Sequence, residues 1–420
     1  MGAKEAFCRL EINSLKAYRH SNTRFTIPAR VVMSEQSGQV MLSLDPQKND
    51  TSLMLDLLRA GAAQMVCVGH AVRFFSGGFN QHWPLPLPHN TGVVLFFILS
   101  GFLITYTLIE RAKDPSYGFG TFLIERTARI YSGLIPALLL VVIVDGIVLH
   151  FVNDPSISVA YNLPTFLANL AMFDSYRGSL SEFPITQWRQ FGSATTLWTL
   201  AIEWHIYLFV AAIFFMGRKP SMIPLLVPVA ILFGQMPSHY IFYALKADGM
   251  GQGLFIAWLL GAFVYFITQH IKVPPLAAAG VAVASLAWYL LSTHARGEYK
   301  LTSYVALAIF LLFLVQASQA TRIIASPRVA TAIRFFAGYS FTLYLIHYTL
   351  MYAVLLLGYR GHAVAIGTIL ISNVVAAAMA IPTEMKHKTI ARLLSKLATT
   401  TAEGARRGAA AVADFSRRRA

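Results

Sequence analysis

The sequence predicts an all-α fold, a polytopic membrane helix bundle of about ten transmembrane helices. Two features of its composition point to this class: 56% of the 420 residues are hydrophobic and only 13% are charged, whereas a soluble domain carries about 25% charged residues. The third observation is that the apolar residues gather in segments of about 20 residues, the length that a helix needs to cross a bilayer. A soluble globular domain is therefore excluded.

The first predicted helix covers residues 53–75 and is apolar, although it carries several polar side chains. Residues 160–173 are also apolar, but they are short and contain Pro164, so they are predicted to form a re-entrant or interfacial segment. The other predicted spans lie approximately at 91–110, 131–151, 194–216, 221–236, 252–269, 275–292, 302–318, 333–357 and 363–382.

The 34 lysine and arginine residues predict the orientation of this bundle. An even number of spans places both termini on one side, and most of the basic residues fall in the tails and loops of that side. For a protein of the inner (plasma) membrane, the positive-inside rule then predicts cytoplasmic termini. Residues 1–52 are expected to be a partly disordered extension and 383–420 a basic tail, on either side of a membrane domain at 53–382. The net charge of +15 is thus attributed to topology and contact with membrane lipids, and no nucleic-acid partner is expected.

Arg59 and His70 are the first candidate functional residues. They are eleven residues apart in the first helix, so they lie on one stripe, separated by roughly 16 Å along the axis. Ionisable groups inside a membrane are functional candidates, and imidazole suits proton transfer near neutral pH. The simpler alternatives are a hydrogen-bonded interior histidine and an arginine that reaches the interface.

The second span and the loop that follows it add Ser100, Arg126 and Arg129. Ser100 and Gly101 are small residues that favour close helix packing, and a nucleophilic Ser100 would need a base within hydrogen-bond distance. Arg126 and Arg129 are three residues apart in the predicted cytoplasmic loop, at the mouth of the third span, so they are expected to share a face. They are either ordinary positive-inside anchors or a clamp for a phosphate group at the cytoplasmic entrance.

Glu203 lies near the middle of the fourth span, where an unpaired carboxylate costs several kcal/mol. Tyr207 follows four residues later, so the two side chains are expected to touch. Glu203 is predicted either to form an ion pair with Arg59 or His70 or to orient the catalytic histidine.

Tyr344 and His347 are three residues apart in the ninth span and are expected to line one cavity or to belong to an aromatic helix face. Glu384, just after the last span, is predicted to pair with Lys386 or Lys388. The two cysteines, Cys8 and Cys67, are not expected to pair, and no metal-ligand spacing is present.

Taken together, these segments resemble the acyltransferase 3 family of membrane O-acyltransferases over residues 53–382. Two departures are visible: Thr199 replaces the serine that usually precedes the acid by four residues, and Glu384 lacks the basic residue and proline that usually follow it. The stretches that carry the resemblance are Arg59-x10-His70, FFILSGFLI at 96–104, Arg126-x-x-Arg129, LWTLAIEWHIYLF at 197–209 and YSFTLYLIH at 339–347.

The resemblance implies an enzyme that moves an acyl group, commonly acetyl, from cytoplasmic acyl-CoA to a hydroxyl of a sugar, lipid-linked oligosaccharide or polysaccharide. Acyl-CoA is then a co-substrate, with no bound cofactor and no metal. His70 is the expected general base or acyl acceptor, Glu203 its support, and Arg59, Arg126 and Arg129 the donor-binding residues. Ser100, Tyr207, Tyr344 and His347 are candidates for the cavity lining.

Two other functions fit the same polar residues. One is a multi-span transporter or exporter of a glycan or acyl compound, in which these residues line the translocation path. Against it, the sequence shows no inverted repeat and no pair of broken helices. The other is a catalytically silent structural subunit.

Overall fold

The computed structural model describes residues 42, 44, 49–77, 83–174, 188–246, 253–294, 297–322 and 326–401, with the backbone alone for 235–246. Most of the predicted N-terminal extension and the end of the basic tail lie outside these residues. Within them the secondary structure is helical, and the only pairing of extended chain is an isolated bridge between Asp174 and Trp188.

The helices follow the chain in the order predicted from hydropathy. They are α2 (Thr51–Phe75), α3 (Pro88–Arg111), α4 (Phe119–Phe151), α5 (Pro155–Ser158), α6 (Leu163–Leu170), α7 (Leu197–Arg218), η2 (Pro220–Met222), α8 (Ile223–Lys246), α9 (Leu254–Thr268), α10 (Pro275–Ser292), α11 (Leu301–Gln319), α12 (Pro327–Leu356), α13 (His362–Ala380) and η3 (Glu384–Lys386).

Each predicted span corresponds to a helix, and the all-α polytopic fold is confirmed. Within the described residues, eight helices are long and apolar enough to cross a membrane, whereas Pro220–Gly234 and Leu254–Thr268 are shorter apolar helices. The segment predicted to be too short to span contains α6, a helix of 8 residues. In the tail, residues 387–401 are helical.

The largest difference from the predicted boundaries is at α4. This helix begins at Phe119, so the segment predicted as a loop is its first part, and α4 reaches 33 residues. The segment consists largely of residues that a helix accommodates well, and Pro136 is tolerated further along inside the helix. Arg126 and Arg129 therefore lie on a helix, which fixes their common face.

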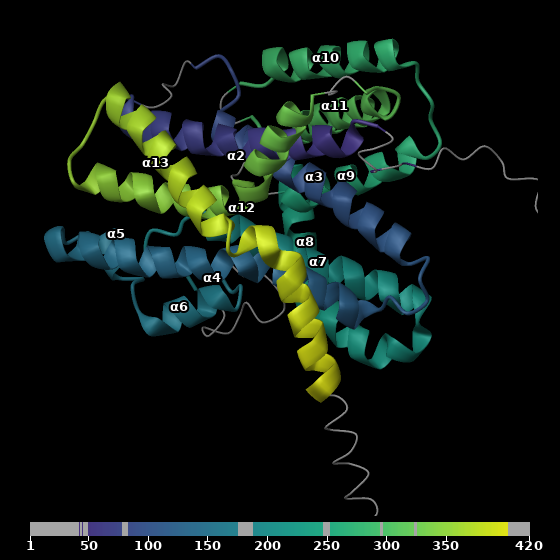
Figure 1. Ribbon diagram of the computed structural model, residues 1–420, viewed down its shortest axis with the longest axis horizontal. Coiled ribbons are helices and arrows are strands. Elements are labelled where there is room, and N and C mark those ends of the chain that lie inside the picture. The colour runs from purple at the N-terminus through teal and green to yellow at the C-terminus, as the bar shows by residue number, and fades with distance from the viewer. Residues whose placement is uncertain are drawn as a thin grey trace, which may run out of the picture. The chain divides into compact units, whose positions relative to one another are not determined.

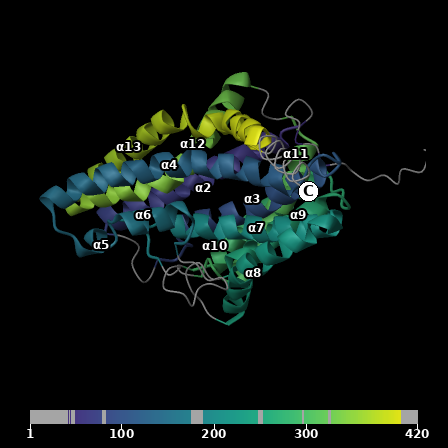
Figure 2. The same ribbon diagram turned by 90° about the horizontal axis from the view of Figure 1, so that it is seen from below.

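Helices α2, α3 and α12 form the centre of the bundle. Helix α2 packs against α12 and α3, α3 packs against α9, and α12 also contacts α4 and α13, as Figures 1 and 2 show. Helix α7 packs against α8, and α10 lies against α11 at the edge of the bundle (Figure 1). Several polar residues of these helices, among them Ser100 and His347, are consequently buried against other helices.

The outer surface of the bundle is apolar. On α4 a stripe of large side chains at four-residue spacing is exposed, from 46% for Ile135 to 70% for Phe151. Residues at this spacing share one helix face. Such a stripe is costly in water but suits the hydrocarbon of a bilayer, so the chain is a multi-pass membrane protein.

Candidate active site

A polar cavity of about 150 Å³ lies between α2, α3, α4, α7 and α12. Six of the residues singled out in the sequence line it together with apolar side chains. They are Arg59, Ser100, Arg126, Arg129, Glu203 and Tyr207. Residues from five helices therefore meet at one place, and the three predicted donor-binding arginines belong to it.

Arg129 is held by a carboxylate from the far end of the chain. Glu384 in η3 forms an ion pair with it at 3.1 Å and is fully buried. The same carboxylate accepts hydrogen bonds from the Thr342 backbone N–H at 2.9 Å and the Thr342 hydroxyl at 2.8 Å. The predicted pairing of Glu384 with Lys386 or Lys388 is wrong, because the chain after α13 brings η3 against α12 and α4.

The guanidinium of Arg59 turns toward a carboxylate on its own helix. It donates to Asp56 at 2.9 Å, and each of these side chains is only about a quarter exposed. Within the described part of the chain, the Nε atoms of Arg59 and Arg126 are buried without a hydrogen-bond partner. Buried donors without a partner are costly, so the cavity presents positive charge and free donors that suit an anion.

Glu203 is bound to the hydroxyl of Tyr207 on the next turn of α7, as the spacing predicts. Tyr207 in turn contacts the Ser100 hydroxyl on α3 at 2.8 Å. Ser100 therefore faces the cavity, whereas its neighbour Gly101 packs against α9. Among the described ion pairs and hydrogen bonds, Glu203 has no direct contact with Arg59 or His70, so the predicted ion pair with either is not formed.

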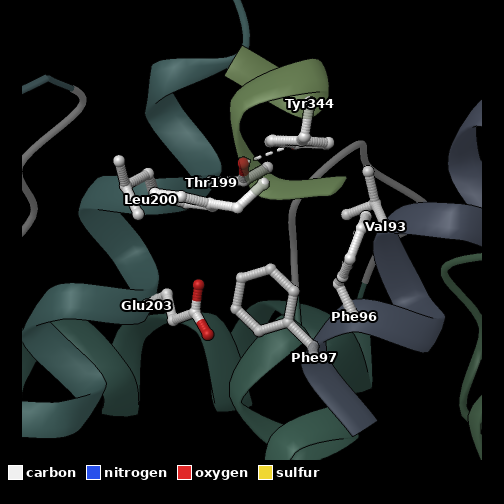
Figure 3. Close-up of a pocket in the computed structure, with 8 residues that line it drawn as sticks. Val93, Phe96, Phe97, Thr199, Leu200, Glu203 and Tyr344 are labelled. Atoms are coloured by element: carbon white, nitrogen blue, oxygen red, sulfur yellow. Dashed lines mark hydrogen bonds between the residues drawn. The ribbon is translucent and has the colours of Figure 1, made fainter. Parts of the chain in front are cut away.

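A second, smaller cavity of about 40 Å³ lies beside the first and shares Glu203 with it. Figure 3 shows the Glu203 carboxylate pointing toward Phe97, with Phe96 and Val93 on the same side of the cavity. At its other end, the Thr199 hydroxyl lies 2.5 Å from the Tyr344 hydroxyl (Figure 3). Threonine thus supplies a hydroxyl at the position where serine is usual.

His70 lies in a cluster of three histidines, outside the lining of both cavities. Its Nδ1 is 3.0 Å from Nε2 of His347, and its ring centre is 4.9 Å from that of His89. His89 and His347 are buried, and the side chain of His70 is partly exposed. The rings of His347 and Tyr344 are 6.2 Å apart, so the cluster adjoins the smaller cavity through Tyr344.

His89 was not singled out in the sequence. The available signal was a polar His-Asn-Thr run at the start of an apolar span, next in sequence order to the helix that carries His70. An added Cβ at Gly69 would lie 2.7 Å from the His89 backbone nitrogen, so glycine allows α3 to begin close to His70. Among the described residues, no group of three or more histidine, cysteine, aspartate or glutamate side chains has a geometry that could hold a metal ion.

The comparison with known proteins bears on the family of the chain. A relative from Bacillus subtilis (strain 168), named "Putative peptidoglycan O-acetyltransferase YrhL", is 31% identical over 163 residues, which cover 37% of this chain and 22% of the relative. The chain thus matches about a fifth of the relative's length, and no solved structure matches it. The acyltransferase 3 model, described as an acyltransferase domain, matches residues 53–382 and favours the enzyme over the transporter and the structural subunit. Since this match covers most of the chain, the protein belongs to the acyltransferase 3 family of acyltransferase enzymes.

Proposed function

We propose that the protein is an O-acyltransferase that moves an acyl group, in particular acetyl, from acyl-CoA to a hydroxyl of an exported glycan. The observation that carries the proposal is the cavity in which three arginines, two of them with buried and unpartnered Nε atoms, meet beside Glu203. Family membership supports the acyl transfer, and the name of the Bacillus relative supports a glycan acceptor.

The donor occupies the arginine-lined cavity in this proposal. Arginine guanidinium groups bind phosphate oxygens through paired hydrogen bonds, and CoA carries a pyrophosphate and a 3′-phosphate. Arg59 lies in the first half of α2, and Arg126 and Arg129 lie in the first half of α4. For a protein of the inner membrane, the positive-inside rule assigns the starts of these two helices to the cytoplasmic side. Acyl-CoA therefore enters from the cytoplasm, and the pantetheine arm extends between the helices toward the histidine cluster.

His70 acts on the acceptor in this proposal. In direct transfer its Nε2 takes the proton of the sugar hydroxyl while the oxygen forms a bond to the acyl carbon. The thioester C–S bond breaks, and the CoA thiolate then receives the proton from His70. In the two-step alternative, His70 Nε2 bonds to the acyl carbon, the thioester C–S bond breaks and CoA thiolate leaves. The sugar oxygen then bonds to the acyl carbon, the Nε2–acyl bond breaks, and the hydroxyl proton passes through Nε2 to the CoA thiolate.

Purified protein in lipid nanodiscs tests this function with [14C]acetyl-CoA and solubilised peptidoglycan strands as the probe acceptor. We expect label in the glycan fraction and release of CoA thiol. His70→Ala should lower the rate by about 10²- to 10⁴-fold, the usual contribution of a positioned general base. The matched control is His270→Ala, which replaces an exposed histidine just after α9 and should retain the rate.

Two results would contradict the proposal: transfer by His70→Ala at the wild-type rate, or no dependence of any acyl transfer on acyl-CoA. Label that stays on the protein in the absence of acceptor, and is lost in His70→Ala, would select the acyl-histidine route. Label absent from the protein during active transfer would select direct transfer.

A further inference from the structure

The contact between His70 and His347 joins two helices across the centre of the bundle. His347 belongs to α12 and is fully buried, and its Nε2 lies 3.0 Å from Nδ1 of His70 on α2. The sequence predicts Glu203 either as an ion-pair partner or as the residue that orients His70. Within the described residues, the side-chain hydrogen bond of His70 is made to His347 instead.

The neighbours of His347 determine which of its nitrogens carries hydrogen. Nδ1 of His347 is 2.9 Å from the backbone carbonyl of Leu343, one turn earlier in α12. A carbonyl oxygen only accepts hydrogen bonds, so this Nδ1 is the N–H of the neutral ring. Nε2 of His347 then carries the lone pair and accepts.

The same reasoning applies to His70. Its Nδ1 faces two acceptors, Nε2 of His347 at 3.0 Å and the carbonyl of Val66 at 3.1 Å. Nδ1 must therefore carry the hydrogen that these two acceptors share. In the neutral ring the lone pair is consequently on Nε2, the nitrogen that is not engaged by His347 or Val66.

We infer that His347 is a positioning residue of the active site, which fixes His70 in the Nδ1–H form and leaves Nε2 free to take the acceptor's proton. The inference rests on the proposed function. His347 takes the part that a carboxylate plays beside a catalytic histidine in hydrolases, where that partner holds the tautomer and the ring orientation. When His70 Nε2 takes the proton, His70 Nδ1–H still donates to His347, so no second proton moves.

An uncharged partner suits this location. A carboxylate buried in the membrane beside a neutral imidazole carries a large desolvation cost, whereas a neutral imidazole can accept one hydrogen bond without a charge. The hydrogen bond from Nδ1 of His347 to the Leu343 carbonyl holds His347 in its Nδ1–H tautomer. The pair is thus ordered before any substrate is bound.

The test compares two substitutions of His347 in the nanodisc assay. His347→Leu removes the acceptor, and His347→Gln places an amide oxygen near the position of Nε2. We expect kcat to fall by about 10²-fold or more in His347→Leu, with an unchanged KM for acetyl-CoA, and at least a tenfold recovery of kcat in His347→Gln. The matched control is His205→Leu, because His205 is also buried and also bonded to the carbonyl four residues before it.

The outcomes separate the inference from the proposed function. Wild-type kcat in His347→Leu, with His70→Ala inactive, overturns the inference and leaves the function standing. Equal losses in His347→Leu, His347→Gln and His205→Leu show a merely structural role and also overturn it. If the variants do not fold, ¹⁵N-histidine spectra of the wild-type protein decide, with the His70 signal identified by its absence in His70→Ala. An Nδ1–H form of His70 supports the inference, and an Nε2–H form contradicts it.

Discussion

At the residue scale, the orientation of Arg129 depends on Glu384, more than 250 positions away in the chain. The carboxylate is anchored by two hydrogen bonds from Thr342, so it offers its remaining oxygen to the guanidinium in a fixed place. A fixed arginine loses less conformational entropy when it binds an anion. Arg59 is held in a similar way by Asp56, which leaves Arg126 as the proposed donor-binding arginine outside the described ion pairs.

Glu384→Gln should therefore weaken donor binding. The neutral amide has the size of the carboxylate that it replaces but does not attract Arg129 by charge. We therefore expect the KM for acetyl-CoA to rise about tenfold, which corresponds to about 1.4 kcal/mol. The initial-rate assay with varied acetyl-CoA measures this change. Glu125→Gln is the control, because Glu125 pairs with the exposed Arg111 and should leave KM unaltered. An unaltered KM in Glu384→Gln would show that Arg129 does not need this anchor.

At the scale of elements, α3 is in close contact with a helix on each side. An added Cβ at Gly92 would lie 2.6 Å from the carbonyl oxygen of Ala62 in α2, and one at Gly101 would lie 1.8 Å from that of Trp258 in α9. Gly261 in α9 approaches α3 in the same way. In a membrane, small residues let two helices approach until their backbones touch. The hydrophobic effect does not drive helices together there, so van der Waals packing stabilises their contact. Ser100 is thereby directed into the arginine-lined cavity.

Gly101→Ala should destabilise the protein, because the added methyl group would clash with the backbone of α9 at Trp258. Helix backbone cannot move aside as a flexible side chain can. Overpacking of this kind typically costs about 1–3 kcal/mol, and we expect a fall in Tm in a thermal-shift measurement in detergent. Gly280→Ala serves as the control, since an added Cβ there has no heavy atom within 4 Å and alanine favours the helix. The same Tm for both variants would mean that α3 and α9 can separate without loss.

At the scale of the whole molecule, orientation decides from which side each substrate arrives. The proposed mechanism needs the arginine-lined cavity at the cytoplasmic face, where acyl-CoA is made available. We expect the loop after α3 and the start of α4 to belong to that face, and the segment after α4 to belong to the opposite one. The proposed direction of acyl transfer thus rests on the distribution of basic residues along the chain.

Labelling of single cysteines tests this orientation. In a Cys8→Ser background the remaining Cys67 is fully buried and should not react. In spheroplasts, an impermeant maleimide should label Asn153→Cys but not Lys113→Cys, both of which stand at exposed positions. The reverse pattern would place the arginine-lined cavity on the outside and remove the cytoplasmic donor from the mechanism.

The sequence by itself determined the spans, the family resemblance and the contacts within single helices. Arg126 and Arg129 share a face, and Tyr207 reaches Glu203, because the helical period fixes which neighbours meet. Only the tertiary structure decided that His347, and not Glu203, binds His70, and that Glu384 binds Arg129. These contacts depend on how each helix is rotated about its axis and how deep it lies in the bundle. Packing among all the helices determines both, so a local sequence pattern cannot predict them.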